Sequence, residues 1–394
     1  MNIMKINIFP FLALLIFTNA LVGQNVEDYL SKIEENNLQL KAAREKQQQK
    51  QAEAHTGIYP KPLSVNYGYF PDNNTVVDKK QTFNITQSFY TPGVYKKMKS
   101  IASDQSDIAK LSYKAKRKDV LFKAKKLMIK LVYSKKMKER WQKRVGFAKK
   151  RLNAVQKELD EGNADALELN KAKFHLLRMK KGLNEQNIQH KQLTEQLTML
   201  NGGNGLNFEG SDYPVFAQVS QDSLFSEKKA ELPSIEIANQ RKEQSKSMVE
   251  LQRSMNLPEL KLGYGSETVG NSSFRGMLVG VSIPLWSNKN KVKAARARSA
   301  YTEADYKSRI LDLKSETAQQ YKTYLSLKKS LKDYQSTIEN SDNIKLLQRS
   351  LELGKISIID YYREVQYYYD IYNEYLKVER EYYLALAEMY KYRL

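Results

Sequence analysis

The chain contains a long internal repeat, which constrains its fold more than any single motif. Three pairs of segments match in the same order: Leu63–Gly68 with Leu260–Gly265, Phe83–Tyr90 with Val279–Trp286, and Leu159–Gly162 with Leu351–Gly354. The offsets between the paired segments are 197, 196 and 192 residues, so the offset changes by only five residues along the chain. A repeat of this length indicates two copies of one structural unit, joined in a single chain.

The N-terminus has the order of a secretory signal peptide. A lysine precedes the apolar run Phe9–Phe17, and small residues follow as far as Gly23, which predicts cleavage between Gly23 and Gln24. The run is shorter than the roughly 20 residues that a membrane-spanning helix requires, which argues against an anchor. We therefore expect residues 1–23 to be a signal peptide and the mature chain to be exported.

The composition limits the cellular compartments that fit the chain, and it argues against disulfide bonds, metal sites and catalysis. The chain has no Cys, so a disulfide framework and a thiolate metal site are excluded. His175 and His190 lie 15 residues apart on a predicted helix, about 22 Å along its axis, too far for one metal. No phosphate loop or catalytic triad is found. We predict no enzyme activity, no cofactor and no metal site in a protein of the bacterial periplasm or outer membrane.

The formal charge of +21 is concentrated in Lys110–Arg151, where we count 18 Lys or Arg against two acidic residues. Such a field attracts polyanions. Export argues against nucleic acid as the partner. We expect instead the solvated face of a long helix, or a face that meets an acidic partner or anionic lipid.

Each repeat is predicted to contain a helix, two strands and a long helical hairpin. The first repeat spans 24–200, a Gly-rich linker spans 201–225, and the second repeat spans 226–394. The opening helices are expected at Val26–Ala54 and Ser234–Met255. The strands are expected at about 62–70, 81–91, 257–266 and 274–286, because apolar and polar residues alternate there.

The alternation gives each strand pair one apolar face. Its residues are Leu63, Val65, Tyr67, Tyr69, Phe83, Ile85, Phe89, Leu260, Leu262, Tyr264, Met277, Val279, Val281, Ile283 and Leu285. No strongly apolar helix is available to cover this face, so we expect it to meet lipid while the polar face lines a water-filled lumen. Four strands cannot close a barrel, which leaves a dimer with 8 strands or a trimer with 12.

The helical hairpins are expected at about 94–200 and 290–392. Pro92 and Pro284 mark the two strand-to-helix junctions, and about sixty residues without proline follow each, enough for a rod of nearly 100 Å. Gly162 and Gly354 are predicted to form the hairpin tips, because a left-handed residue suits such a reversal. Narrow apolar stripes on these helices predict coiled-coil packing.

This duplicated order of elements behind a signal peptide resembles the TolC-type outer-membrane efflux protein family. The resemblance is carried by Val281–Trp286, by the matching Gln87–Pro92, and by the Leu-x-x-Gly turn at each tip. It implies a mostly α chain with a small transmembrane β part. As a homotrimer it would form a 12-stranded outer-membrane β-barrel continued by a 12-helix periplasmic α-barrel.

The resemblance also implies a function and partners. The chain would be the exit duct of a tripartite efflux system, with a periplasmic adaptor (membrane fusion) protein and an inner-membrane pump of the resistance-nodulation-division class. Leu257–Lys293 is similar to members that work with heavy-metal cation pumps, which favours metal cations or small toxic molecules as substrate. A type I protein secretion duct and a periplasmic coiled-coil adaptor or scaffold are alternatives.

A pore constriction is implied by the same resemblance. Glu168 and Asp360 each lie six residues after a tip glycine, and in the family such carboxylates face the pore, where a ring of like charge favours cations. Alternatively, Glu168 and Asp360 solvate a helix or pair with Lys171 and Arg363. The chain departs from the family's full gate set, with Leu351, Ile356 and Arg363 at the gate positions.

Overall fold

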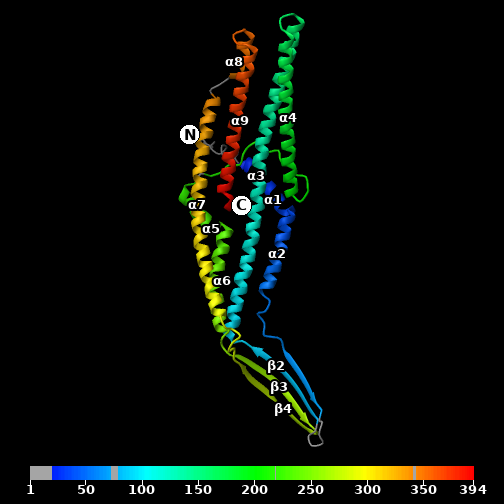
Figure 1. The fold of residues 1–394 in the computed structure, drawn as a ribbon, viewed down its shortest axis with the longest axis vertical. Helices are drawn as coiled ribbons and strands as arrows, with labels where there is room; N and C mark the ends of the chain where they lie inside the picture. The colour runs from blue at the N-terminus through cyan, green and yellow to red at the C-terminus, as the bar shows by residue number, and fades with distance from the viewer. Residues whose placement is uncertain (1–19, 72–78, 218, 340–342) are drawn as a thin grey trace, which may run out of the picture. The chain divides into compact units, whose positions relative to one another are not determined.

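The computed structural model describes residues 20–71, 79–217, 219–339 and 343–394. The chain is mostly helical with one small sheet, which confirms the coarse fold class (Figure 1). Most of the expected signal peptide lies outside the described residues. No helix of the described part is long and apolar enough to span a membrane. The chain divides into two compact units: unit 1 is Met1–Lys41, Arg117–Leu224 and Glu316–Leu394, and unit 2 is Ala42–Lys116 and Phe225–Ser315.

The sheet of unit 2 joins the two repeats. Its strands are β1 (Ser64–Phe70), β2 (Lys80–Phe89), β3 (Glu259–Val269) and β4 (Ser272–Ser282), and they follow one another in the order β1-β2-β3-β4 with antiparallel pairing (Figure 1). β3 and β4 are connected by only Gly270 and Asn271, and Gly270 has φ 57°, as a tight hairpin turn requires. β2 of the first repeat therefore pairs directly with β3 of the second.

The register places the predicted apolar residues on one face. A row across the four strands contains Val65, Ile85, Tyr264 and Met277, and the next row, on the opposite face, contains Asn66, Asn84, Gly265 and Gly276. Because strand side chains alternate between faces, most residues of the other rows follow the same division, but Gln87, Ser266 and Arg275 lie on the apolar face, and Phe274 and Leu278 lie on the other. Met277 and Val279 are 89% and 74% exposed, so no part of the described chain covers the apolar face there. The separation predicted from alternation is confirmed.

The fourth strand ends earlier than the sequence predicts. We expected it to reach Trp286, but β4 ends at Ser282, because Pro284 has no N–H to donate to a neighbouring strand. Residues 283–290 connect the strand to α7 (Lys291–Glu339). Pro92, in contrast, is the first residue of α3 (Pro92–Asp160), a position where the missing N–H costs nothing.

The prediction of a single opening helix at Val26–Ala54 is wrong. The structure has α1 (Ala20–Asn36) and α2 (Leu38–Ala54), separated by the buried Asn37. Its side-chain oxygen accepts from the backbone N–H of Leu40 at 3.0 Å, which caps α2. Its Nδ2 donates to the carbonyl oxygen of Leu200 at 2.7 Å. An asparagine that caps a helix therefore breaks a segment without Gly or Pro.

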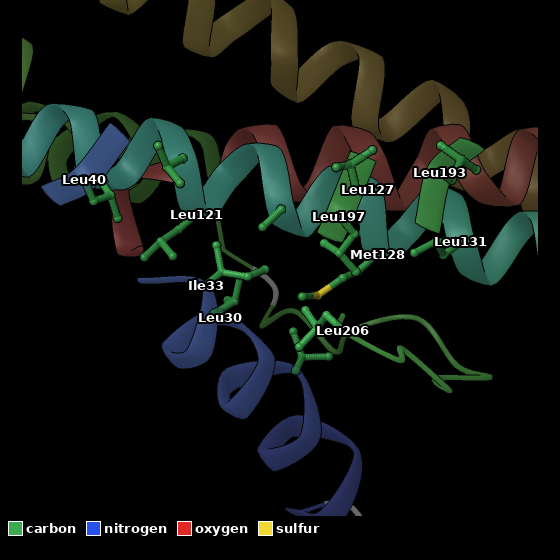
Figure 2. Close-up of a cluster of buried hydrophobic side chains, with 13 residues drawn as sticks. Leu30, Ile33, Leu40, Leu121, Leu127, Met128, Leu131, Leu193, Leu197 and Leu206 are labelled. Atoms are coloured by element: carbon green, nitrogen blue, oxygen red, sulfur yellow. The ribbon is translucent and has the colours of Figure 1, made fainter. Parts of the chain in front are cut away.

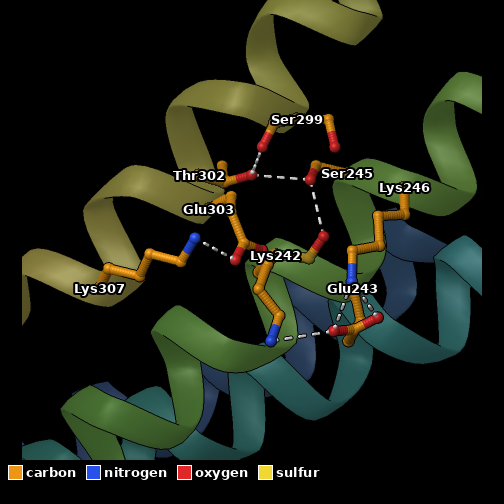
Figure 3. A network of polar contacts seen from close by, with 8 residues as sticks. All are labelled: Lys242, Glu243, Ser245, Lys246, Ser299, Thr302, Glu303 and Lys307. Atoms are coloured by element: carbon orange, nitrogen blue, oxygen red, sulfur yellow. Dashed lines mark hydrogen bonds and ion pairs between the residues drawn. The ribbon is translucent and has the colours of Figure 1, made fainter. Parts of the chain in front are cut away.

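The second repeat opens with α6 (Pro233–Ser254), which packs on α7 through a small polar network. Figure 3 shows the buried Ser245 facing Thr302, with their hydroxyl oxygens 2.7 Å apart. Exposed ion pairs flank this contact, such as Lys307 with Glu303 at 3.2 Å. An additional helix, α5 (Gln221–Glu231), begins inside the segment that the sequence assigned to the linker.

Unit 1 has its core where α1, α3, α4 (Ala166–Leu200) and the linker meet. Figure 2 shows Leu30 and Ile33 of α1, Met128 of α3 and Leu206 of the linker in one cluster of buried side chains. The linker is thus packed against the core through Leu206. Further along it, the ring of Tyr213 stacks on Tyr383 of α9 (Ile358–Met389) with centroids 4.2 Å apart.

Candidate pore constriction at the hairpin tips

The two hairpin tips have the same backbone geometry. α3 ends at Asp160 and α8 (Asn343–Glu352) ends at Glu352, and the tip glycines Gly162 and Gly354 have φ 77° and 65°. Equivalent hydrogen bonds close both turns: Asn163 N–H to Glu158 O at 2.7 Å, Lys355 N–H to Ser350 O at 2.9 Å, Gly162 N–H to Leu159 O at 3.0 Å and Gly354 N–H to Leu351 O at 2.9 Å. Such six-residue turns require a left-handed residue, for which glycine is favoured.

Helix caps fix the positions of the two candidate carboxylates. The backbone N–H of Glu168 donates to Asp165 Oδ1 at 2.7 Å, and that of Asp360 donates to Ser357 Oγ at 3.1 Å. Glu168 and Asp360 are thus the third residues of α4 and α9, where an acidic side chain also favours the helix dipole. Sequence reasoning missed Asp165 and Ser357, although Asp-x-x-Glu and Ser-x-x-Asp are capping signals.

The two carboxylates differ in their partners. Both residues are half-buried. The Ser357 hydroxyl donates to Asp360 Oδ2 at 2.7 Å, and Arg363 Nη2 lies 2.8 Å from Asp360 Oδ1. The hydrogen bond from Ser357, followed by the charge of Arg363, lowers the pKa of the Asp360 carboxyl. The alternative pairing expected from the sequence therefore occurs for Asp360. For Glu168, no ion pair with Lys171 is found among the described residues.

Two of the residues that depart from the family's gate have an apolar role. Leu351 and Ile356 pack against a cluster of buried side chains beneath the tips, which includes Tyr361 and Val365 of α9. The positions where the family carries polar gate residues thus contribute to the packing of the second hairpin. Asp360 and Arg363 form a polar pair at this tip.

A buried arginine joins α3 and α9 in the same unit. Arg144 of α3 is only 4% exposed, and its Nη2 donates to Asn373 Oδ1 of α9 at 2.7 Å. Its guanidinium carbon lies 4.2 Å from the ring centroid of Tyr369 and 4.7 Å from that of Trp141. Burial lowers the pKa of Arg144 to about 10. The guanidinium is therefore held between two aromatic rings, a favourable cation–π arrangement.

Trp141 reaches this position because the facing residue of α4 is glycine. A Cβ on Gly182 would lie 2.3 Å from Cζ3 and 2.4 Å from Cη2 of Trp141. We call Trp141, Arg144, Gly182, Tyr369 and Asn373 the Arg144 junction. It links α3 to both α4 and α9. Sequence reasoning missed it, because the contact between Arg144 and Asn373 joins residues 229 positions apart.

The basic stretch is only partly a solvated face. Arg117 pairs with Glu34 at 2.6 Å, Lys136 pairs with Glu379 at 2.9 Å, and Arg140 lies over the ring of Tyr372. The expectation of a solvated helix face is wrong for these residues and for Arg144, because their side chains bridge α3 to other helices.

The histidines are not brought together. The ring of His175 packs on Tyr362 with centroids 4.5 Å apart, and burial, with a smaller effect from Arg178, lowers the pKa of His175 to about 4. The Nδ1 of His190 lies 3.3 Å from Ser134 Oγ instead. Within the described parts of the chain, no group of three or more His, Cys, Asp or Glu side chains could hold a metal ion.

Residues 224–392 match the family model described as outer membrane efflux protein. The second repeat belongs to this efflux protein family. The matched residues cover nearly all of this repeat (226–394), which contains β3, β4 and the second hairpin. No curated protein matches the sequence of the chain.

Solved structures with the same fold extend the likeness to both repeats. CusC has a TM-score of 0.75 and 16% identity, covering 94% of this chain and 92% of its own. CmeC of Campylobacter jejuni has a TM-score of 0.69 and 16% sequence identity, and the match covers 94% of this chain and 85% of the CmeC chain. VceC of Vibrio cholerae has a TM-score of 0.71 and 12% sequence identity, and the match covers 94% of each chain. Identities this low establish the fold alone. With the family match, they confirm the resemblance to TolC-type efflux proteins, which are transport ducts and not enzymes.

Proposed function

We propose that the chain is one subunit of the outer-membrane exit duct of a tripartite efflux system. The sheet of unit 2 is the observation that carries this proposal. Its apolar face is exposed, its other face is mostly small and polar, and its outer strands β1 and β4 have no second neighbour among the described residues. If the apolar face contacts lipid and the polar face lines a water-filled lumen, each face lies in a solvent that suits its side chains.

The two outer strands support assembly into a homotrimer. An unpaired strand edge exposes backbone N–H and C=O groups, which is unfavourable in lipid, so a transmembrane sheet must close. Pairing of β1 with β4 of the next copy, three times over, gives a 12-stranded barrel. The hairpins of three copies then form the 12-helix periplasmic α-barrel that the family resemblance implies.

The partners proposed are a periplasmic adaptor and an inner-membrane pump of the resistance-nodulation-division class. The substrates proposed are metal cations or small toxic molecules, from the similarity of the second strand pair to the heavy-metal branch. Conduction through such a duct is passive, so it requires no resident metal site and no cofactor.

The proposal is tested with the full chain, purified in detergent and reconstituted in planar bilayers. We expect a particle with the mass of three chains plus detergent, and discrete conductance steps after insertion. The mass is measured by light scattering with refractive-index correction. A monomer that stays in solution without detergent, or trimers that leave bilayer conductance unchanged, would contradict the proposal.

The constriction formed by Glu168 and Asp360 has its own test. We expect Glu168→Gln with Asp360→Asn to lower the cation-to-anion permeability ratio at least about twofold, because two rings of three negative charges are removed. The caps Asp165 and Ser357 are retained, so the tips should keep their fold. Glu185→Gln, which removes an exposed carboxylate further along α4, is the matched control. Reversal potentials measured in a salt gradient give the ratio, and equal ratios in all three proteins would reject the pore-facing assignment.

A further inference from the structure

A cavity of about 670 Å³ lies within unit 2, between α3, α6, α7 and the loop that follows α2. The apolar part of its lining consists of Ala54, Ile58, Met98, Ile101, Ala102, Ile108, Met248 and Leu251. Small-molecule sites in proteins have volumes of about 300–1,000 Å³ and combine an apolar lining with a few polar groups. The cavity therefore has the size and the mixed lining of a site for a small organic molecule.

Hydrogen bonds between the helices fix the walls of this cavity. The hydroxyl oxygens of Ser245 on α6 and Thr302 on α7 lie 2.7 Å apart (Figure 3). Toward α3, the Gln244 side chain donates from Nε2 to Gln105 Oε1 at 2.9 Å. Gln105 uses its oxygen in this contact, and its Nε2 forms no hydrogen bond with another described residue. The walls are therefore in place before a ligand arrives, and one amide donor in the lining is available to it.

Two arginines, Arg241 of α6 and Arg298 of α7, are the only charged side chains among the described residues that line the cavity. Each lies four residues before a member of the contact between Ser245 and Thr302. α6 and α7 run antiparallel, because α6 leads into β3 and α7 follows the antiparallel strand β4. The two arginines therefore lie on opposite sides of that contact, two helical turns or about 12 Å apart along the helices.

Neither Arg241 nor Arg298 forms an ion pair with another described residue, and both are exposed. Acidic side chains near them are engaged elsewhere. Asp104 of α3 accepts from Gln240 at 2.9 Å. Three further carboxylates form the ion pairs Glu243–Lys246, Glu303–Lys307 and Asp305–Arg309. The positive charge of the lining is therefore uncompensated, and a concave site of this kind attracts anions.

We propose that this cavity is a binding site for an amphipathic organic anion, with its apolar body against Met98, Ile101 and Met248 and its carboxylate or sulfonate held by Arg241 and Arg298. Guanidinium groups form paired, charge-assisted hydrogen bonds with such oxygens. An inorganic anion would leave the apolar lining in contact with water, and a neutral apolar molecule would leave both arginines without a counter-charge. The inference does not rest on the proposed function, because residues of one chain form the whole cavity.

The test compares two probes that share one ring system. The anion is 8-anilinonaphthalene-1-sulfonate, and N-phenyl-1-naphthylamine is the same molecule without the sulfonate. The full chain is titrated in nanodiscs of zwitterionic lipid, and the signal of empty nanodiscs is subtracted. We expect one site per chain for the anion. Arg241→Gln with Arg298→Gln should weaken binding of the anion about tenfold, from the loss of two exposed charge pairs, and binding of the neutral probe less than about twofold.

Two further variants separate the cavity from a general charge effect. Lys293→Gln with Arg296→Gln removes two exposed positive charges from α7 outside the lining, and should change the affinity for the anion less than about twofold. Ala102→Leu extends a side chain of the lining, and should weaken both probes at least about fivefold, because it occupies space that the rings need. Isothermal titration gives affinities and numbers of sites, and circular dichroism shows that each variant keeps its helix content.

Several outcomes would overturn the inference. These are equal weakening of the anion by the two charge variants, no weakening by either, or a signal no greater than that of empty nanodiscs. An equal loss of both probes in Arg241→Gln with Arg298→Gln would also overturn it, because the arginines would then not recognise the sulfonate. If the chain stays in solution without detergent, the same titrations are made in buffer, so that failure of the proposed duct leaves this test intact.

Discussion

Replacing Gly182 by alanine is expected to destabilise the chain by about 1–2 kcal/mol, although alanine is the better helix former. The new Cβ would lie 2.3 Å from the Trp141 ring, and overpacking of this kind costs about 1–3 kcal/mol. The ring cannot move away freely, because the Arg144 guanidinium lies against it. The gain in helix propensity is only about 1 kcal/mol, so the clash dominates. Gly182→Val adds two further methyl groups, so we expect it to lower the free energy of unfolding by about 3 kcal/mol.

Gly146→Ala is the matched control for this substitution. Gly146 also lies within a helix, but a Cβ there would meet no atom within 4 Å. We expect an increase in stability of about 0.5–1 kcal/mol from helix propensity. Unfolding of detergent-solubilised protein, followed by circular dichroism, gives both values. Effects of the same sign at Gly182 and Gly146 would show that Trp141 does not pack on α4 as the structure has it.

Replacing Arg144 by alanine is expected to lower the free energy of unfolding by about 3 kcal/mol. The change removes the aliphatic stem that packs between the helices and two cation–π contacts. It also removes the donor to Asn373 Oδ1, a partly buried acceptor. Because both helices lose this connection, the midpoint of thermal unfolding should fall by several degrees.

Arg144→Lys distinguishes the guanidinium from its charge. Lysine keeps the charge and most of the stem, but it lacks the planar fork that stacks on Tyr369 and Trp141. We expect Arg144→Lys to lower the free energy of unfolding by about 1–2 kcal/mol, so that its stability lies between those of the wild type and Arg144→Ala. Arg178→Ala on α4, an exposed arginine outside the junction, should change stability by less than about 0.5 kcal/mol. Equal free energies of unfolding for Arg144→Ala and Arg144→Lys would contradict a role for the planar guanidinium group.

The sequence predicts the parts of this molecule that depend on local chemistry. Alternation assigned Val65 and Met277 to one face of the sheet, and the register places them in the same row. Gly162 and Gly354 were expected at turns that need a positive φ, and both have one. These features follow from single residues and their immediate neighbours, so no knowledge of the rest of the fold is needed.

Features that depend on distant partners were not predictable in this way. Asn37 breaks a helix because its side chain caps the next one and also reaches Leu200, 163 residues away. Arg144 and Lys143 are neighbours of the same type in one basic stretch, yet one is buried among aromatic rings and the other is exposed. Only the packing of α4 and α9 on α3 separates them. The candidate carboxylates came from the family resemblance together with their equivalent positions in the two repeats, whereas their caps were not predicted.

The pairing of β2 with β3 also sets an order of events during folding. Lys80 pairs with Val269, 189 residues further along the chain, so the centre of the sheet closes a very long loop. Before that, the first repeat can offer only the β1–β2 hairpin, and an isolated two-stranded hairpin is marginally stable in water. The sheet of the first repeat is therefore completed only by the second repeat, and the four-stranded sheet with its apolar face forms only after β3 and β4 have been synthesised.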